Sequence, residues 1–219
     1  MIRRGLFLIA LAAVLITPDA RLVSAAGPTR EEALTALADA RDVDNRRRGA
    51  MALAETGVIA DVPKLAAALR DDDPLVRQLA ERAMWEVWSR SGDAAVDRLL
   101  ATGVEQMSAR EGELAAQTFT EVIRRRPDFA EGWNKRATVY YLMGEYQKSL
   151  ADCDEVMKRN PYHFGALAGY AQIYVRLEYY DRALEYSRRA LKVNPNMDGV
   201  RRNIDLIEHL LEQRRRQMI

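Results

Sequence analysis

The sequence contains few of the residues from which proteins build catalytic and metal sites. Its 219 residues include one cysteine, Cys153, and two histidines, His163 and His209. It has no CxxC or HExxH motif and no glycine-rich loop of the kind that cradles phosphates. We therefore expect no metal, no cofactor, no small-molecule substrate and no enzymatic activity. An enzyme with an unrecognised site is the alternative.

An excess of charge of either sign is also missing. Lys and Arg number 33 and Asp and Glu number 32, which gives a formal net charge of +1. A nearly neutral chain exerts no general attraction on a phosphate backbone, so we expect no nucleic-acid partner. Cys153 falls at a helical position that is typical of core packing, and we expect it to be a buried, inert thiol.

No apolar run is long enough to cross a bilayer. The longest run covers residues 5–16, whereas a membrane-spanning helix needs roughly 17 to 25 residues. Basic Arg3 and Arg4 precede this run, and small residues around Ala25 and Ala26 follow it. The pattern predicts a secretory signal peptide over 1–26, cleaved after Ala25 or Ala26, and hence a periplasmic protein. Retention of this segment as a membrane anchor is the alternative.

Three of the seven prolines stand in phase. Pro127, Pro161 and Pro195 lie 34 residues apart, and apolar residues at helical spacing fill the intervals. In the middle interval large, small and turn residues occur in a fixed order, at Trp133, Ala137, Tyr140, Gly144, Tyr146 and Ser149. This spacing resembles the tetratricopeptide repeat, a helical pair of 34 residues.

The resemblance implies a domain over 93–219 with repeats at about 96–129, 130–163 and 164–197. Glu178 stands where the third repeat is expected to have its turn glycine. Because an end repeat cannot bury its own apolar face, the array needs a closing helix. Residues 198–216 are predicted to form it, with one apolar side made by Val200, Ile204, Ile207 and Leu211.

Residues 27–92 carry a different helical pattern, with two copies offset by about 29 residues. In the second copy the run DDDPLVRQLAERA, residues 71–83, places an aspartate turn before a Val-Arg helix start. This run resembles the short HEAT-like repeats of bacterial proteins, and the aspartates are expected to cap the following helices. Trp85 and Trp88 share one helix face and are predicted to pack at a seam between the two blocks. The predicted fold is an all-α, right-handed solenoid of helical hairpins.

The tetratricopeptide resemblance also implies a binding site, because the first helices of such repeats line a concave groove. It selects as partner-binding residues Asn134, Lys135, Thr138, Tyr141, Gln172 and Arg176. Small Gly165 and Gly169 are expected to leave room for a ligand backbone that the polar side chains would hydrogen-bond. We predict a non-catalytic scaffold of the cell envelope that binds a peptide segment or helix of a partner protein. The alternative is that these side chains are only solvated surface.

Arginine occurs in three triplets, at 46–48, 124–126 and 214–216. The last two end predicted helices, where positive charge offsets the helix dipole. The alternative is contact with anionic lipid headgroups, as in a peripheral membrane-surface adaptor. Arg136 stands at a position that the repeats usually fill with leucine, and we expect Asp152 or Glu155 to neutralise it.

Overall fold

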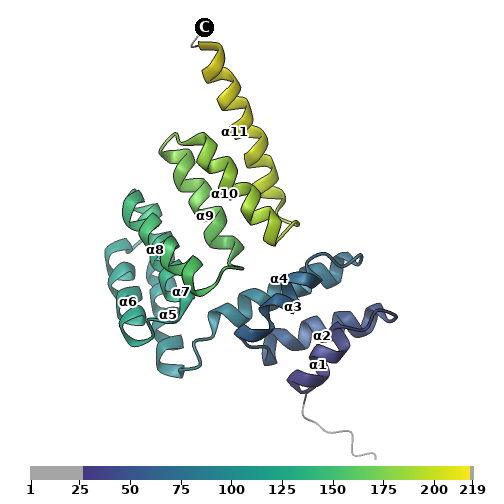
Figure 1. Ribbon diagram of the computed structural model, residues 1–219. Coiled ribbons are helices and arrows are strands. Elements are labelled where there is room, and N and C mark those ends of the chain that lie inside the picture. Colours follow the sequence, from purple (N-terminus) through teal and green to yellow (C-terminus); the bar gives the residue numbers. More distant parts are fainter. Residues whose placement is uncertain (1–26, 218–219) are drawn as a thin grey trace, which may run out of the picture.

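The computed structural model describes residues 27–217, so the predicted signal peptide lies outside the described part. Within these residues the chain forms α-helices, one short 3-10 turn and the connections between them, which confirms the all-α prediction (Figure 1). The elements are α1 (Arg30–Leu37), α2 (Val43–Thr56), η1 (Ile59–Asp61), α3 (Val62–Ala68), α4 (Pro74–Ser89), α5 (Ala94–Ser108), α6 (Gly112–Arg125), α7 (Ala130–Leu142), α8 (Tyr146–Arg159), α9 (Phe164–Arg176), α10 (Tyr180–Val193) and α11 (Asp198–Gln217).

The helices from α5 to α10 form three consecutive hairpins, α5–α6, α7–α8 and α9–α10. Each hairpin turns through one residue with a positive φ: Arg110 at 64°, Gly144 at 78° and Glu178 at 60°. These residues are 34 positions apart, so the backbone repeats with the period of the prolines. Glu178 thus adopts the left-handed conformation for which glycine was expected, a conformation that is costly for a residue with a Cβ.

Small side chains let the two helices of a hairpin approach closely. A Cβ built on Gly103 would lie 2.5 Å from the Phe119 ring, and Ser149 Oγ donates a 2.7 Å hydrogen bond to the Ala137 carbonyl. Arg136 is neutralised as predicted: its Nε and Nη2 lie 2.8 and 2.7 Å from the two carboxylate oxygens of Asp152.

Helix α11 closes the array. It starts 34 residues after α9 begins and packs where the first helix of a further repeat would lie. Its apolar residues Ile204, Ile207 and Leu211 join the cluster around Tyr174 and Leu184. The predicted closing helix is therefore confirmed.

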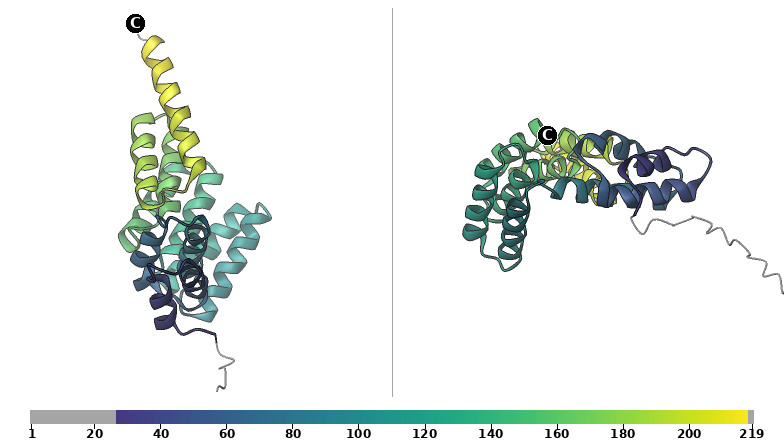
Figure 2. Two further views of the ribbon diagram at one scale, coloured as in Figure 1. Left: turned by 90° about the vertical axis from the view of Figure 1, so that its right-hand side faces the viewer. Right: turned by 90° about the horizontal axis from the view of Figure 1, so that it is seen from below.

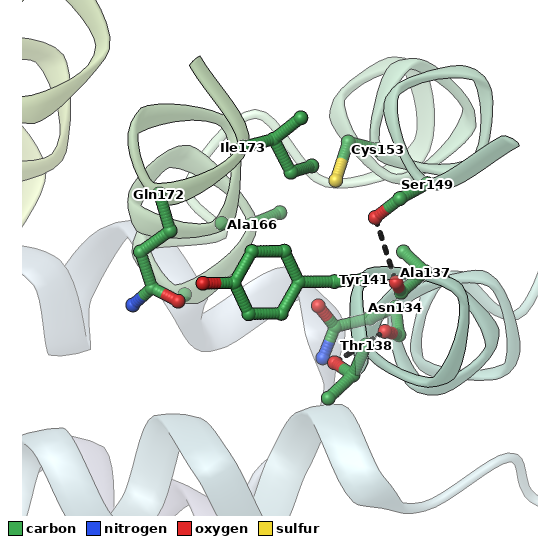
Figure 3. Close-up of a pocket in the computed structure, with 11 residues that line it drawn as sticks. Asn134, Ala137, Thr138, Tyr141, Ser149, Cys153, Ala166, Gln172 and Ile173 are labelled. Atoms are coloured by element: carbon green, nitrogen blue, oxygen red, sulfur yellow. Dashed lines mark hydrogen bonds between the residues drawn. The ribbon is translucent and has the colours of Figure 1, made fainter. Parts of the chain in front are cut away.

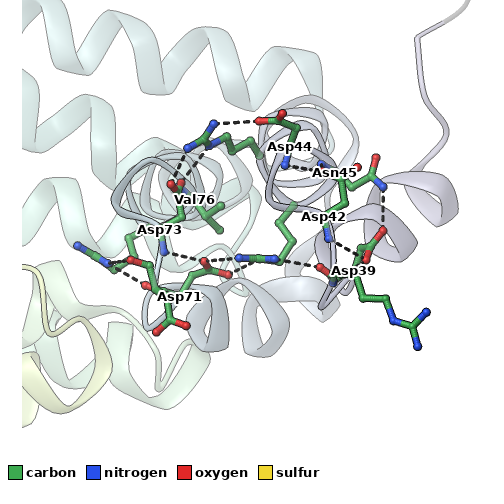
Figure 4. A network of polar contacts seen from close by, with 12 residues as sticks. Asp39, Asp42, Asp44, Asn45, Asp71, Asp73 and Val76 are labelled. Carbon is green, nitrogen blue, oxygen red and sulfur yellow. Dashed lines mark hydrogen bonds and ion pairs between the residues drawn. The ribbon is translucent and has the colours of Figure 1, made fainter.

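The N-terminal block, residues 30–89, consists of two further hairpins, α1–α2 and α3–α4. Asp42 and Asp73 cap α2 and α4, because the side chain of each accepts hydrogen bonds from backbone N–H groups in the first turn. Two bidentate ion pairs hold the hairpins together, Arg46 with Asp71 and Arg47 with Asp73, within the network drawn in Figure 4. The resemblance to HEAT-like repeats stays a prediction.

The predicted seam between the blocks is made by the two tryptophans of α4. Trp88 stacks on His163 with ring centroids 4.4 Å apart, and Trp85 meets Phe164 edge-on at 5.3 Å. Asn196 adds a hydrogen bond of 2.8 Å from its side-chain amide to the Leu69 carbonyl. The blocks form one elongated solenoid, with the N-terminal helices and the α5–α8 hairpins at opposite ends when viewed from below (Figure 2).

Candidate functional site

Two first helices, α7 and α9, and the second helix α8 enclose a hollow on the face that the resemblance predicts to be concave, here called the concave face. It has a volume of about 180 Å³ and lies between α7, α8 and α9. Figure 3 shows Tyr141 reaching from α7 toward α9, with Cys153 and Ser149 of α8 above it in the view. This first hollow is lined by Asn134, Ala137, Thr138, Tyr141, Ser149, Cys153, Gly165, Ala166, Gly169, Gln172 and Ile173.

A second hollow of about 170 Å³ adjoins the first, between α9, α10 and α11. Tyr141 and Gln172 line both hollows, so the two form one continuous binding face. Arg176 lines the second one, where its Nε donates a 3.3 Å hydrogen bond to the Tyr141 hydroxyl. The second hollow is lined by Tyr141, Ala171, Gln172, Val175, Arg176, Ser187, Asn203, Leu206 and Ile207.

Five of the six predicted binding residues line these hollows: Asn134, Thr138, Tyr141, Gln172 and Arg176. Thr138 and Gln172 are exposed, whereas Asn134 and Tyr141 are half-buried. The sixth, Lys135, lines neither hollow. Its Nζ lies 2.9 Å from a carboxylate oxygen of Glu131, so its charge is directed into the fold and not toward a ligand.

Glu131 is the centre of a buried polar network at one end of the concave face. It is 1 % exposed, and its carboxylate accepts from Lys135, from the Asn134 amide at 3.2 Å and from His163 Nε2 at 3.0 Å. Burial opposes ionisation of Glu131, yet the interactions with His163 and Lys135 prevail and lower its pKa below the usual value. Nδ1 of His163 accepts a hydrogen bond from the Ala166 N–H at 3.0 Å. The ring proton is therefore on Nε2, which donates the hydrogen bond to Glu131.

Sequence reasoning missed this network. The sequence marks His163 only as one of two histidines, and the side chain is fully buried at the seam under Trp88. Glu131 lies beside the predicted binding residues on α7, but His163 of the α8–α9 connection meets its carboxylate, and Trp88 of α4 stacks on that imidazole. No spacing signals the Glu131–His163 pair, because it depends on how two repeats stack under Trp88.

The N-terminal block also limits the concave face. A Cβ built on Gly165 would lie 2.6 Å from Cη2 of Trp85, so this glycine makes room for tryptophan. The space that the missing side chain leaves is thus filled by Trp85 and not by a ligand, although Gly165 still lines the first hollow. Gly169, one turn further along α9, remains open: its nearest neighbour would be Cys153 Sγ at 3.8 Å.

Most of the arginines in the first two triplets are neutralised. Arg46 and Arg47 hold the N-terminal hairpins together, Arg124 and Arg125 pair with Glu121, and Arg126 pairs with Asp128. Among the described residues no three His, Cys, Asp or Glu side chains converge as metal ligands do. In the same part of the chain, each helix is too short or too polar to span a bilayer.

Comparisons with known sequences assign the third hairpin. Residues 165–197 match the profile of the Tetratricopeptide repeat family. A TPR repeat-containing protein of Rhizobium etli is 38% identical over 86 residues, which are 39% of this chain and 42% of the relative. Hsp70-Hsp90 organizing protein 1 of Glycine max is 30% identical over 97 residues, which are 42% of this chain and 17% of that protein. The chain thus spans less than half the length of these curated relatives.

Solved structures confirm the fold of the second half. The TPR domain of Sgt2 from Aspergillus fumigatus superimposes with a TM-score of 0.54 at 19% identity, over 57% of this chain and 83% of that one. The TPR2B domain of yeast Sti1, in complex with pHsp70, gives 0.50 at 22% identity, over 56% and 99%. The first TPR of Spaghetti (RPAP3), bound to the HSP90 peptide SRMEEVD, gives 0.52 at 17% identity, over 53% and 93%. The C-terminal helices therefore have the tetratricopeptide fold.

Proposed function

We propose that the chain is a non-catalytic interaction scaffold of the cell envelope that binds a peptide segment or helix of a partner protein along its concave face. The observation that carries the proposal is the pair of adjoining hollows that Tyr141 and Gln172 both line. A continuous face with two side-chain-sized recesses suits a ligand that runs across several helices.

The chemistry of the face supports this function. Hydroxyl, amide and phenol groups of Thr138, Asn134, Gln172 and Tyr141 offer both donors and acceptors, as a peptide backbone requires. The recesses are small compared with the roughly 300 to 1,000 Å³ of typical small-molecule sites. Peptides of HSP90 and a pHsp70 complex occur on the similar folds of Spaghetti and Sti1, which gives a precedent for peptide binding on this architecture.

A capture experiment with matched variants tests the function. The mature chain, residues 27–219, is immobilised and exposed to an envelope extract beside a Tyr141→Ala, Gln172→Ala variant. We expect the parent to capture a defined partner that the variant does not retain, because both substituted side chains line both hollows. Circular dichroism must show that the variant stays folded.

The control carries the same two types of substitution outside the hollows, at Tyr179 and Gln147. Both side chains are exposed, and neither lines the concave recesses. Capture that survives in this control and fails in the Tyr141, Gln172 variant places the partner on the concave face. Equal capture by all three proteins would contradict the proposed function.

Export to the periplasm is a separate part of the proposal and has its own test. Cell fractionation of a C-terminally tagged chain should place it in the periplasm, with an N-terminus at Ala26 or Gly27. An intact N-terminus in the membrane fraction would mean that residues 1–26 are retained as an anchor. Recovery of the chain in the cytosol would refute export.

A further inference from the structure

A groove lies at the seam between the two blocks and is here called the seam groove. It is lined by α3 of the N-terminal block and by α8, α9 and α10 of the repeats, and its volume is about 630 Å³. This volume is within the roughly 300 to 1,000 Å³ of typical small-molecule sites. The seam groove shares no lining residue with either hollow of the concave face, so it is a separate candidate site.

Apolar side chains form the walls of the seam groove. Pro63 and Ala67 lie on the α3 side, and Met157, Leu167 and Val193 lie on the side of the repeats. Pro63 and Ala67 are exposed, and Met157 and Val193 are half-buried, so solvent reaches both walls. An aliphatic ligand that displaced this water would gain free energy in proportion to the apolar area it covers.

Three positive charges and no carboxylate line the seam groove. The cations belong to Arg70, Arg189 and Lys192, and all three residues are exposed. Arg189 has a loose ion pair of 3.7 Å with the exposed Glu185. Within residues 27–217, Arg70 and Lys192 form no ion pair, and the partners of the Arg70 guanidinium are backbone carbonyls. An anionic group that enters the groove is therefore attracted.

Arg70 also connects the two walls. Its guanidinium donates to the Ala66 carbonyl at 3.2 Å, to the Val193 carbonyl at 3.3 Å and to the Lys192 carbonyl. The last two carbonyls lie at the end of α10, where the helix dipole would repel an anion, and Arg70 offsets this negative end. A guanidinium has five N–H donors, so two remain for a ligand.

Neutral polar side chains are scarce in the seam groove, in contrast to the concave face. Its lining residues include no Asn, Gln, Ser or Thr, and Tyr162 is the only one with an uncharged polar group. A peptide backbone carries a donor and an acceptor at nearly every residue, and these would lose their hydration here without replacement. An aliphatic chain with one charged end has no such groups to satisfy.

We propose that the seam groove binds a single-chain anionic amphiphile, such as a fatty acid. The aliphatic chain lies against Met157 and Leu167, and the charged head lies at Arg70 and Lys192. The ligand is held and not converted, and its binding does not depend on a partner at the concave face. Because both blocks line the groove, the bound ligand stabilises their junction.

Isothermal titration calorimetry of the mature chain, residues 27–219, tests the chemistry of the ligand. The probes are decanoate, octanoate and uncharged octan-1-ol, each kept monomeric in solution. Decanoate should bind about tenfold more tightly than octanoate, because the groove buries two further CH₂ groups. Octan-1-ol should bind more weakly than octanoate, because it brings no charge to the cations. Decanoate at about a hundredfold excess over its dissociation constant should raise the thermal midpoint of unfolding by about 5 to 10 °C.

Variants of the exposed cations test the place of the charged head. Lys192→Gln, Arg189→Gln removes two charges and leaves Arg70 in its contacts with the backbone. It should weaken decanoate binding about tenfold and leave octan-1-ol binding unchanged. Lys148→Gln, Arg202→Gln is the matched control, because both residues are exposed and lie outside the groove. This control should bind decanoate as the parent does.

A variant that fills the groove tests the place of the aliphatic chain. Ala67→Trp puts a large side chain between the walls and should abolish binding of decanoate and octan-1-ol alike. Ala151→Trp is the control, since Ala151 is an exposed helical residue that does not line the groove. Circular dichroism checks that both variants keep their helices.

Several results would overturn the inference. They are the absence of decanoate binding, equal affinity for octanoate and octan-1-ol, and unchanged decanoate affinity in Ala67→Trp or in the Lys192, Arg189 variant. Binding to phosphatidylglycerol vesicles without binding of monomeric decanoate would assign the charges to a lipid surface instead. The Tyr141→Ala, Gln172→Ala variant should bind decanoate normally, so a failure of this inference and a failure of the proposed function are distinguishable.

Discussion

Glu131 and His163 face each other in the interior, 3.0 Å apart from carboxylate oxygen to Nε2, with neither side chain exposed to solvent. They join the first turn of α7 to the start of α9, directly beneath Trp88. One pair of residues thus connects two repeats with the N-terminal block. A buried charge of this kind is stable only while all its donors remain in place.

Glu131→Ala should lower the free energy of unfolding by about 3 to 5 kcal/mol, since it leaves the His163 and Lys135 donors without their acceptor. Urea denaturation at pH 7 measures the change. Glu208→Ala is the control, because Glu208 forms an exposed ion pair with Arg188 that is worth at most about 1 kcal/mol. Equal midpoints for the two variants would contradict the buried network.

The protein should lose stability in acid through its carboxylates. Hydrogen bonds from Arg47 and from the backbone of α4 lower the pKa of Asp73 to about 2, below an unfolded value of about 3.9. A lowered folded pKa contributes stability that is present above about pH 4 and is lost as the pH falls to about 2. Asp73→Asn should be less stable at pH 7 and should show a shallower loss of stability across this range. Urea midpoints at pH 7, 4 and 3 test this, and parallel curves for both proteins would refute it.

The Cys153 thiol should be inert in the folded protein. Burial, with the charges of Asp152 and Asp154, raises its pKa to about 12, so almost no thiolate exists at pH 8. Ellman's reagent should react with it only after urea unfolds the chain. Because the folded pKa is raised, stability should fall as the pH rises above the unfolded value of about 8.5. Rapid labelling without denaturant would show that the first recess opens to solvent.

The periodic features of the fold could be predicted from the sequence, and the contacts between repeats could not. Prolines at a 34-residue spacing predict the hairpins and the closing helix because local residues set helix ends and turns. Trp133 fits the motif, yet its ring is only half-buried, with the guanidinium groups of Arg136 and Arg159 5.2 and 4.7 Å from its centroid. Burial at this position depends on its neighbours in space, and no spacing encodes them.

The binding residues also divide into those whose position helical phase predicts and those whose position depends on contacts made in the fold. Thr138, Tyr141 and Gln172 line the concave face because helical phase alone decides which side they occupy. Lys135 has the right phase as well, but a buried acid on its own helix attracts its ammonium group. The recess over Ser187 also escaped prediction, since three helices must pack before it exists.

The turn residues offer a test of backbone strain. Glu178 adopts a φ of 60° in the same turn position where Gly144 has 78°. Glu178→Gly should raise the free energy of unfolding by about 0.5 to 1 kcal/mol, because relief of the left-handed strain exceeds the added entropy of the unfolded chain. Gly144→Ala should lower it by about 1 kcal/mol for the converse reason. Chemical denaturation measures both, and changes of the same sign would contradict this account of the turn.

The seam between the blocks depends on the absence of a side chain at Gly165. A Cβ there would lie 2.6 Å from the Trp85 ring, so Gly165→Val should force Trp85 away from α9 and destabilise the protein by about 1 to 3 kcal/mol. Tryptophan fluorescence, in a Trp133→Phe background, should shift to the red as Trp85 and Trp88 gain contact with water. Gly169→Ala is the matched control, because its Cβ meets only Cys153 Sγ, at the ordinary distance of 3.8 Å. If Gly165→Val kept the parent's spectrum and unfolding midpoint, the tryptophan seam would not hold the two blocks together.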